Sequence, residues 1–196
     1  MLASGMTVWI SRAIRSGGRL LTSPAARANV LHEWRRRLGG EPALPAAPIR
    51  SVLVLCHGNI CRSPLAAALL LRSRPDLAVV SAGLAAGDGA PADPLAVRAA
   101  SGLGVDLTGH RSRPVTPGLV AGADLVLVME ATHARALRAY APEAAPRTRL
   151  LGDFLEAGPF RIPDPWGLPH EVFAATFARI DAAVSRLAAR LDAPAR

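Results

Sequence analysis

Apolar residues along this chain follow two spacings that alternate from residue 51 onward. Four short apolar runs have the length expected of strands buried on both faces of a sheet. They lie at residues 51–55, 77–81, 123–129 and 148–151. Four other segments are helix-compatible, and the last carries one long apolar face. They lie at residues 64–72, 93–102, 132–140 and 171–191. Strands that alternate with helices predict an α/β fold, a three-layer sandwich around a four-stranded parallel sheet.

The first 48 residues have a different character. Residues 30–38 show helical spacing with basic residues between the apolar ones, and two glycines end the segment. Residues 41–48 contain three prolines and three alanines, which is typical of a linker. We therefore predict a basic N-terminal extension and linker at 1–48, and one domain at 49–196. We expect that domain to function when residues 1–48 are removed.

Composition and charge exclude several classes of protein. Of the 196 residues, 51% are hydrophobic and 19% are charged, which provides a core and excludes general disorder. Residues 1–50 hold eight arginines and two glutamates, whereas the rest holds fifteen arginines and thirteen acidic residues. The nearly neutral body argues against a nucleic-acid-binding protein. The uneven charge leaves the extension as the basic part.

The sequence predicts a cytoplasmic protein. No apolar run approaches the roughly 18 residues that cross a bilayer, and residues 6–10 are too short for a signal-peptide core. The two cysteines, Cys56 and Cys61, suit a reducing compartment. The extension could be a membrane-touching segment, a presequence, a tail or an artefact of the start site. We favour the tail or the artefact and do not expect peripheral membrane contact.

The turn after the first predicted strand carries the candidate chemistry. Residues 56–64 read Cys-His-Gly-Asn-Ile-Cys-Arg-Ser-Pro and lead directly into a helix. Backbone N–H groups at such a turn cradle an anion, and the helix dipole stabilises a thiolate at Cys56. Arg62 can hold a phosphate through two parallel hydrogen bonds. The sequence therefore predicts a phosphate-binding loop with a cysteine nucleophile.

This turn resembles the signature of the low-molecular-weight protein tyrosine phosphatases. Further segments resemble the same family in order and spacing, and the similarity covers about residues 50–192. They are residues 81–84, 92–94, 109–113, 124–130 and the Asp-Pro-aromatic segment 162–166. The similarity is greatest to the bacterial branch associated with exopolysaccharide and capsule export. It implies a phosphotyrosine protein as partner, a tyrosine autokinase among the candidates, and neither cofactor nor metal.

The resemblance also implies a role for each site residue. Cys56 attacks phosphorus, Arg62 holds the phosphate, and Asp164 protonates the leaving phenolate. Asp153 is the alternative candidate for the acid that protonates the phenolate. Other residues are expected to bind the phosphate or the substrate ring: His57, Gly58, Asn59, Ile60, Cys61 and Trp166.

The resemblance assigns supporting roles to further side chains. Asn59 is expected to hold the loop open through Ser63, Ser81 and His110, and Ser63 to donate to the thiolate. Cys61 either pairs reversibly with Cys56 under oxidation or is a small packing residue.

His133 is expected at a helix surface. Two features depart from the family. His57 is unusual beside the nucleophile, and residues 85–90 lack the second aromatic of some members.

Three other functions compete with this prediction. Arsenate reduction on the same fold requires cysteines outside the loop, and the chain has none. Protein arginine phosphatases have a threonine at the position of Ile60. A catalytically inactive phosphate-binding module would not require Cys56, Arg62 and Asp164 together. Turnover of a phosphotyrosine substrate distinguishes the last of these from an enzyme.

Overall fold

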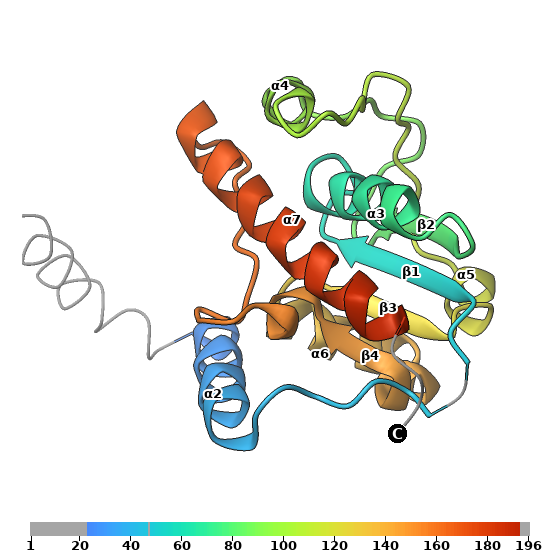
Figure 1. Ribbon diagram of the computed structural model, residues 1–196, viewed down its shortest axis with the longest axis vertical. Helices are drawn as coiled ribbons and strands as arrows, with labels where there is room; N and C mark the ends of the chain where they lie inside the picture. The colour runs from blue at the N-terminus through green and yellow to red at the C-terminus, as the bar shows by residue number, and fades with distance from the viewer. Residues whose placement is uncertain (1–22, 47, 193–196) are drawn as a thin grey trace, which may run out of the picture.

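A computed structural model describes residues 23–46 and 48–192 as an α/β sandwich (Figure 1). The parallel sheet has the order β2-β1-β3-β4. Its strands are β1 (Ser51–Cys56), β2 (Ala78–Gly83), β3 (Leu125–Val128) and β4 (Thr148–Leu150). The predicted fold class is confirmed. What the sequence suggested for residues 1–22 lies outside the described residues.

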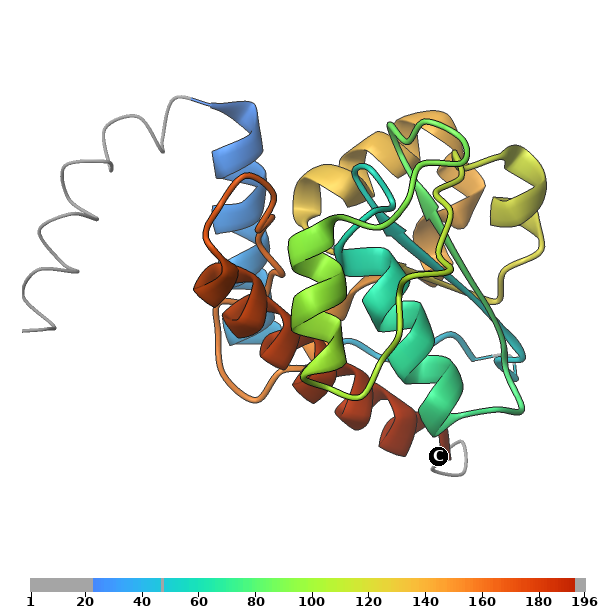
Figure 2. The same cartoon turned by 90° about the horizontal axis from the view of Figure 1, so that it is seen from above.

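Helices cover both faces of the sheet (Figure 2). The helices are α2 (Pro24–Gly39), α3 (Arg62–Ser73), α4 (Pro94–Ser101), α5 (Pro117–Ala121), α6 (Ala131–Tyr140) and α7 (His170–Asp192). Two short 3-10 helices complete the chain, η1 (Pro142–Arg147) and η2 (Leu151–Phe154). Each helix predicted from apolar spacing forms. The ends of α3, α4, α6 and α7 lie within two residues of the prediction, whereas α2 begins six residues before the predicted segment 30–38. The pattern did not predict α5, whose five residues are too few for a visible period.

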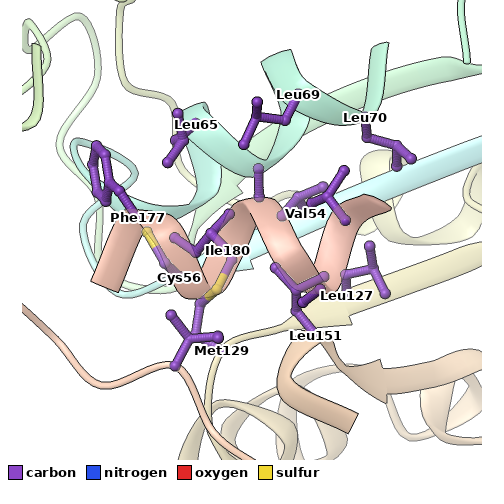
Figure 3. Packing of buried hydrophobic residues seen from close by; sticks show 14 of the residues in the cluster. Val54, Cys56, Leu65, Leu69, Leu70, Leu127, Met129, Leu151, Phe177 and Ile180 are labelled. Atoms are coloured by element: carbon purple, nitrogen blue, oxygen red, sulfur yellow. The ribbon is translucent and has the colours of Figure 1, made fainter. Parts of the chain in front are cut away.

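Two hydrophobic cores flank β1 because successive side chains of a strand point to opposite faces. Val52, Val54 and Cys56 face the core shared with α3 and α7, whereas Leu53 and Leu55 face the core shared with α6. Figure 3 shows the first core, in which Ile180 of α7 packs close to Val54 and Cys56. The carboxyl end of β1 is therefore held rigidly between two packed layers, and the signature turn begins there.

Helix α2 belongs to the basic segment that precedes the predicted domain. The Ser23 side chain caps it by accepting a hydrogen bond from the Ala26 N–H at 3.0 Å, and Gly40, with φ of 71°, follows its last turn. The helix packs against α6, far away in sequence (Figure 1). No helix within 23–46 and 48–192 is long and apolar enough to cross a membrane.

Candidate active site

The signature turn runs from the end of β1 to the start of α3 and lies against the end of β2. The Leu84 N–H donates to the Cys56 carbonyl at 3.0 Å, and the Ala85 N–H donates to the His57 carbonyl at 2.9 Å. A Cβ atom on Gly83 would lie 2.7 Å from the His57 carbonyl oxygen, closer than real Cβ atoms approach. Glycine at position 83 is therefore what allows β2 to approach the loop this closely.

Asn59 holds the loop in its curled shape. Its φ of 53° is left-handed, which asparagine tolerates better than most residues. Its side-chain amide donates to Ser63 Oγ and Ser81 Oγ, both at 2.9 Å, and its side-chain oxygen accepts from the Arg113 N–H at 3.0 Å. The side chain of Asn59 is thus fully buried, and its three hydrogen bonds stabilise the curled shape of the loop.

His110 contacts the loop from the segment after α4. Its Nε2 lies 2.6 Å from the Asn59 carbonyl oxygen. Burial lowers the pKa of His110, and the neighbouring Arg113 and Arg111 act in the same direction, while the bond to Asn59 opposes them. A neutral imidazole that donates to this carbonyl is the form favoured by burial.

The Cys56 sulfur is surrounded by donors. Ser63 Oγ lies 3.0 Å from Cys56 Sγ, and the Asn59 backbone N–H donates to the same sulfur at 3.2 Å. Cys56 is buried at the carboxyl end of β1, directly before the turn that opens α3. A thiolate at this position receives hydrogen bonds from both groups, which stabilises the nucleophilic form of the cysteine.

Arg62 is the buried cation of the site, with 1% of its surface exposed. Its Nη1 donates to Glu130 Oε1 at 3.0 Å and to the Ile162 carbonyl at 3.1 Å, and its Nη2 lies 2.5 Å from Asp164 Oδ2. Its Nε is buried and has no hydrogen-bond partner among the described residues. These contacts fix the guanidinium plane and leave the Nε–H and one Nη2–H for a bound anion.

A pocket of about 270 Å³ opens above the loop. It brings together most of the predicted site residues. They are Cys56, His57, Gly58, Ile60, Cys61, Arg62, Asp164 and Trp166. Trp166, which lines this pocket, is 65% exposed. The backbone N–H of Trp166 donates to Asp164 Oδ1 at 3.2 Å. Asp164 and Trp166 therefore approach the loop from the far end of the sequence.

The rival carboxylate Asp153 lies elsewhere. It is buried in η2, and its Oδ1 is 2.6 Å from Nε2 of His32 in α2. It is not among the residues that line the pocket. Of the two candidate acids, only Asp164 lines the pocket that contains Cys56.

Cys61 is the second thiol of the signature turn. Cys56 and Cys61 are both free thiols. Burial, followed by the nearby Asp93 and the Cys56 thiolate, raises the pKa of Cys61 far above its usual value, so Cys61 stays protonated. Its reversible pairing with Cys56 remains a prediction.

No cluster of three His, Cys, Asp or Glu side chains in the described part of the chain could hold a metal ion.

His133 corrects one expectation from the sequence. It lies on α6 with 7% of its surface exposed, rather than at the helix surface. Burial, with the nearby Arg62 and His57 adding to it, lowers its pKa to about 3. Its neutral ring therefore adjoins the active site. His133 lies one turn before the buried Leu137, on the same face of α6, and this spacing could have predicted that His133 is buried.

This burial predicts a pH dependence of stability. The unfolded chain binds a proton at His133 below about pH 6.5 and the folded protein does not, so stability falls as the pH is lowered. At about pH 5 this penalty is roughly 2 kcal/mol. Urea unfolding near pH 7 and pH 5 should show a smaller loss of stability for His133→Gln than for the wild type. Equal losses in the two proteins would contradict the assignment.

The geometry can be compared with known proteins. The family described as "Low molecular weight phosphotyrosine protein phosphatase" matches residues 51–196. The chain belongs to this family. The match spans the loop, the pocket and the segment that carries Asp164. Family membership makes the chain a protein tyrosine phosphatase, a cysteine-dependent hydrolase.

Individual relatives agree with the family assignment. The probable low molecular weight protein-tyrosine-phosphatase EpsP of Ralstonia solanacearum is 39% identical over 145 residues, covering 74% of this chain and 98% of the relative. The tyrosine phosphatase Wzb of Escherichia coli K30, solved in complex with sulphate, is 39% identical with a TM-score of 0.70, covering 73% and 99%. The YwlE arginine phosphatase of Geobacillus stearothermophilus is 34% identical with a TM-score of 0.68, covering 72% and 92%.

The sequence did not assign a role to Glu130. It lies two residues after the end of β3, directly before α6, and accepts a hydrogen bond from Arg62. Carboxyl ends of neighbouring parallel strands meet at one edge of a sheet, so its position after β3 was a usable signal. A buried arginine requires a carboxylate partner, and Glu130 supplies it.

Proposed function

We propose that this protein hydrolyses phosphotyrosine through a cysteinyl-phosphate intermediate. The observation that carries the proposal is the buried Arg62, fixed by Glu130 and Ile162, in one pocket with Cys56 and Asp164. A nucleophile, a cation that binds a dianion and a carboxylic acid are the three groups that transfer of a phosphoryl group from an aryl ester needs.

The two chemical steps use the same residues. In the first step the Cys56 thiolate forms a bond to phosphorus as the P–O bond to the ring breaks, and Asp164 gives its proton to the departing oxygen. In the second step Asp164 removes a proton from water, which attacks phosphorus, breaks the S–P bond and releases phosphate. Arg62 and the loop N–H groups stabilise the equatorial oxygens in both transition states. We expect neither metal nor cofactor to take part.

The pocket walls favour an aromatic substrate. Ile60 and Trp166 line it, and an exposed indole suits stacking with a tyrosine ring. A phosphoarginine substrate would place a charged guanidinium against Ile60, which costs desolvation. We therefore propose phosphotyrosine proteins as substrates, and a tyrosine autokinase of polysaccharide export as the partner. We propose that the protein acts in the cytoplasm, with residues 49–196 as its catalytic domain.

Phosphate release tests the proposed function. Wild type is assayed on a phosphotyrosine peptide and on the same peptide with phosphoarginine, in chelator and reductant. We expect turnover of the phosphotyrosine peptide and little release from phosphoarginine. The reverse preference would support the arginine phosphatase alternative. A folded protein that binds phosphate but releases none from phosphotyrosine would contradict the proposed function.

A further inference from the structure

Helix α2 docks on the catalytic domain through its polar side. Asn29, Glu33 and Arg36 all bond to residues more than 100 positions away. The opposite side is apolar and exposed, with Leu31 at 51% and Trp34 at 63%. An ordinary surface helix buries its apolar side instead. Specific polar contacts therefore hold α2 in place. Those of Asn29 and Glu33 reach segments next to the active site, whereas His32 and Arg36 bond to Asp153 outside the pocket.

One group of contacts reaches the loop that carries the general acid. Glu33 Oε2 accepts a hydrogen bond from the Phe160 N–H at 2.7 Å. The Arg36 guanidinium lies 4.4 Å from the centre of the Phe160 ring and donates to the Asp153 carbonyl. Phe160 lies four residues before Asp164 and is buried. Helix α2 thus fixes the chain just upstream of the acid.

The loop is held on its other side by the active site itself. The Ile162 N–H donates to the Met129 carbonyl at 2.9 Å, and the Ile162 carbonyl accepts from Arg62. Glu33 and Arg62 therefore bind the same short segment at Phe160 and Ile162. This two-sided attachment sets the distance between Asp164 and the phosphate-binding loop.

A second contact reaches the partner of Arg62. Asn29 Nδ2 donates to Glu130 Oε2 at 3.2 Å, and Asn29 Oδ1 accepts from the Ala131 N–H at 3.0 Å. The other oxygen of Glu130 accepts from Arg62 at 3.0 Å. A continuous chain of hydrogen bonds therefore runs from α2 through Glu130 to the guanidinium.

We propose that α2 is a positioning element of the active site, in which Glu33 positions the general-acid loop and Asn29 positions the Glu130–Arg62 pair. The inference rests on the proposed function, because it concerns the same site. Helix α2 precedes residues 51–196, the part that matches the family. If α2 positions the site, removing residues 1–48 should lower activity, contrary to what we expected from the sequence. A shift of about 1 Å in a catalytic group can reduce a rate by roughly 10²-fold.

The leaving group of the substrate distinguishes positioning from a general loss of structure. Phenolate requires a proton as it leaves, whereas dinitrophenolate departs readily without one. Glu33→Ala should lower kcat/KM, which reports the step in which the leaving group departs, about tenfold on phenyl phosphate and less than about twofold on dinitrophenyl phosphate. Glu33→Gln keeps an acceptor for the Phe160 N–H and should restore wild-type values. Arg36→Ala, which removes the contact over Phe160, should give the same selective loss.

Inorganic phosphate is the probe for the Asn29 contact. Asn29→Ala should raise the inhibition constant of phosphate about fivefold, since the carboxylate that orients Arg62 loses its own hydrogen bond. Arg35→Ala is the matched control for both assays. Arg35 is exposed on the same helix and makes no side-chain hydrogen bond or salt bridge among the described residues. It should match the wild type in both.

Each outcome decides between the proposals. A wild type without turnover of either ester would contradict the proposed function before any variant is compared. An active wild type with kcat/KM of Glu33→Ala unchanged, or lowered equally on both esters, would overturn the role of Glu33. An unchanged phosphate constant for Asn29→Ala would overturn the role of Asn29. Thermal unfolding of each variant keeps a loss of folding separate from these results.

Discussion

Replacing Cys56 with serine abolishes turnover while phosphate binding remains. The Ser hydroxyl is protonated at neutral pH and is a poor nucleophile, so activity should fall by at least about 10⁴-fold. Arg62 and the side chain of Asn59 do not bond to the sulfur, and a serine hydroxyl can replace it as a partner for Ser63 and for the Asn59 backbone N–H. The measurements are phosphate release from a phosphotyrosine peptide and calorimetric titration with inorganic phosphate.

The two measurements together separate chemistry from binding. Loss of turnover with phosphate affinity within about threefold of the wild type assigns Cys56 to the chemical step. Loss of both would indicate that the loop had rearranged. A Cys56→Ser protein that still releases phosphate would contradict the assignment of the nucleophile.

Replacing Asp164 with alanine has the second largest effect. Among the described residues, Asp164 is the only carboxylate that lines the pocket, and its Oδ2 lies 2.5 Å from Arg62. Removing the acid should lower kcat/KM on phenyl phosphate, which reports phosphoryl transfer to Cys56, by about 10²–10⁴-fold. The loss of kcat/KM should be much smaller on dinitrophenyl phosphate, whose leaving group does not need the proton.

Asp153→Asn is the matched comparison for Asp164→Ala. Asp153 is bonded to His32 outside the pocket, so its replacement should keep the wild-type dependence on the leaving group. If Asp164→Ala kept full activity on phosphotyrosine while Asp153→Asn lost it, the two carboxylates would have to exchange roles.

The sequence predicted most of the fold because its signals are local. Each strand of the sheet corresponds to a short apolar run, and each long helix to a helical spacing. Asp93, the first residue of the predicted helix 93–102, caps α4 by accepting hydrogen bonds from the Leu95 and Ala96 N–H groups. The loop chemistry was also local, since Cys56 and Arg62 are six residues apart. Asp164 was placed by resemblance, because nothing within the Asp-Pro pair indicates its distant partner.

Contacts between distant segments could not be predicted in the same way. Glu33 and the Phe160 N–H are 127 residues apart, and no local sequence signal in either segment indicates that the two are in contact. The apolar residues of 30–38 indicated a helix, and the usual rule would bury them. The structure buries the polar side of that helix instead. Trp34 is therefore exposed and Glu33 partly buried, the reverse of what the pattern predicts.

Trapping the phosphoenzyme tests the central claim most directly. Asp164→Ala slows the attack of water, so the intermediate formed from dinitrophenyl phosphate should accumulate and survive rapid quenching. Cleavage after Arg50 and Arg62 releases one peptide that contains both Cys56 and Cys61. Fragmentation of this peptide should place a single phosphoryl group on Cys56. A phosphoryl group on Cys61 or His57, or none during active turnover, would contradict the cysteinyl-phosphate mechanism.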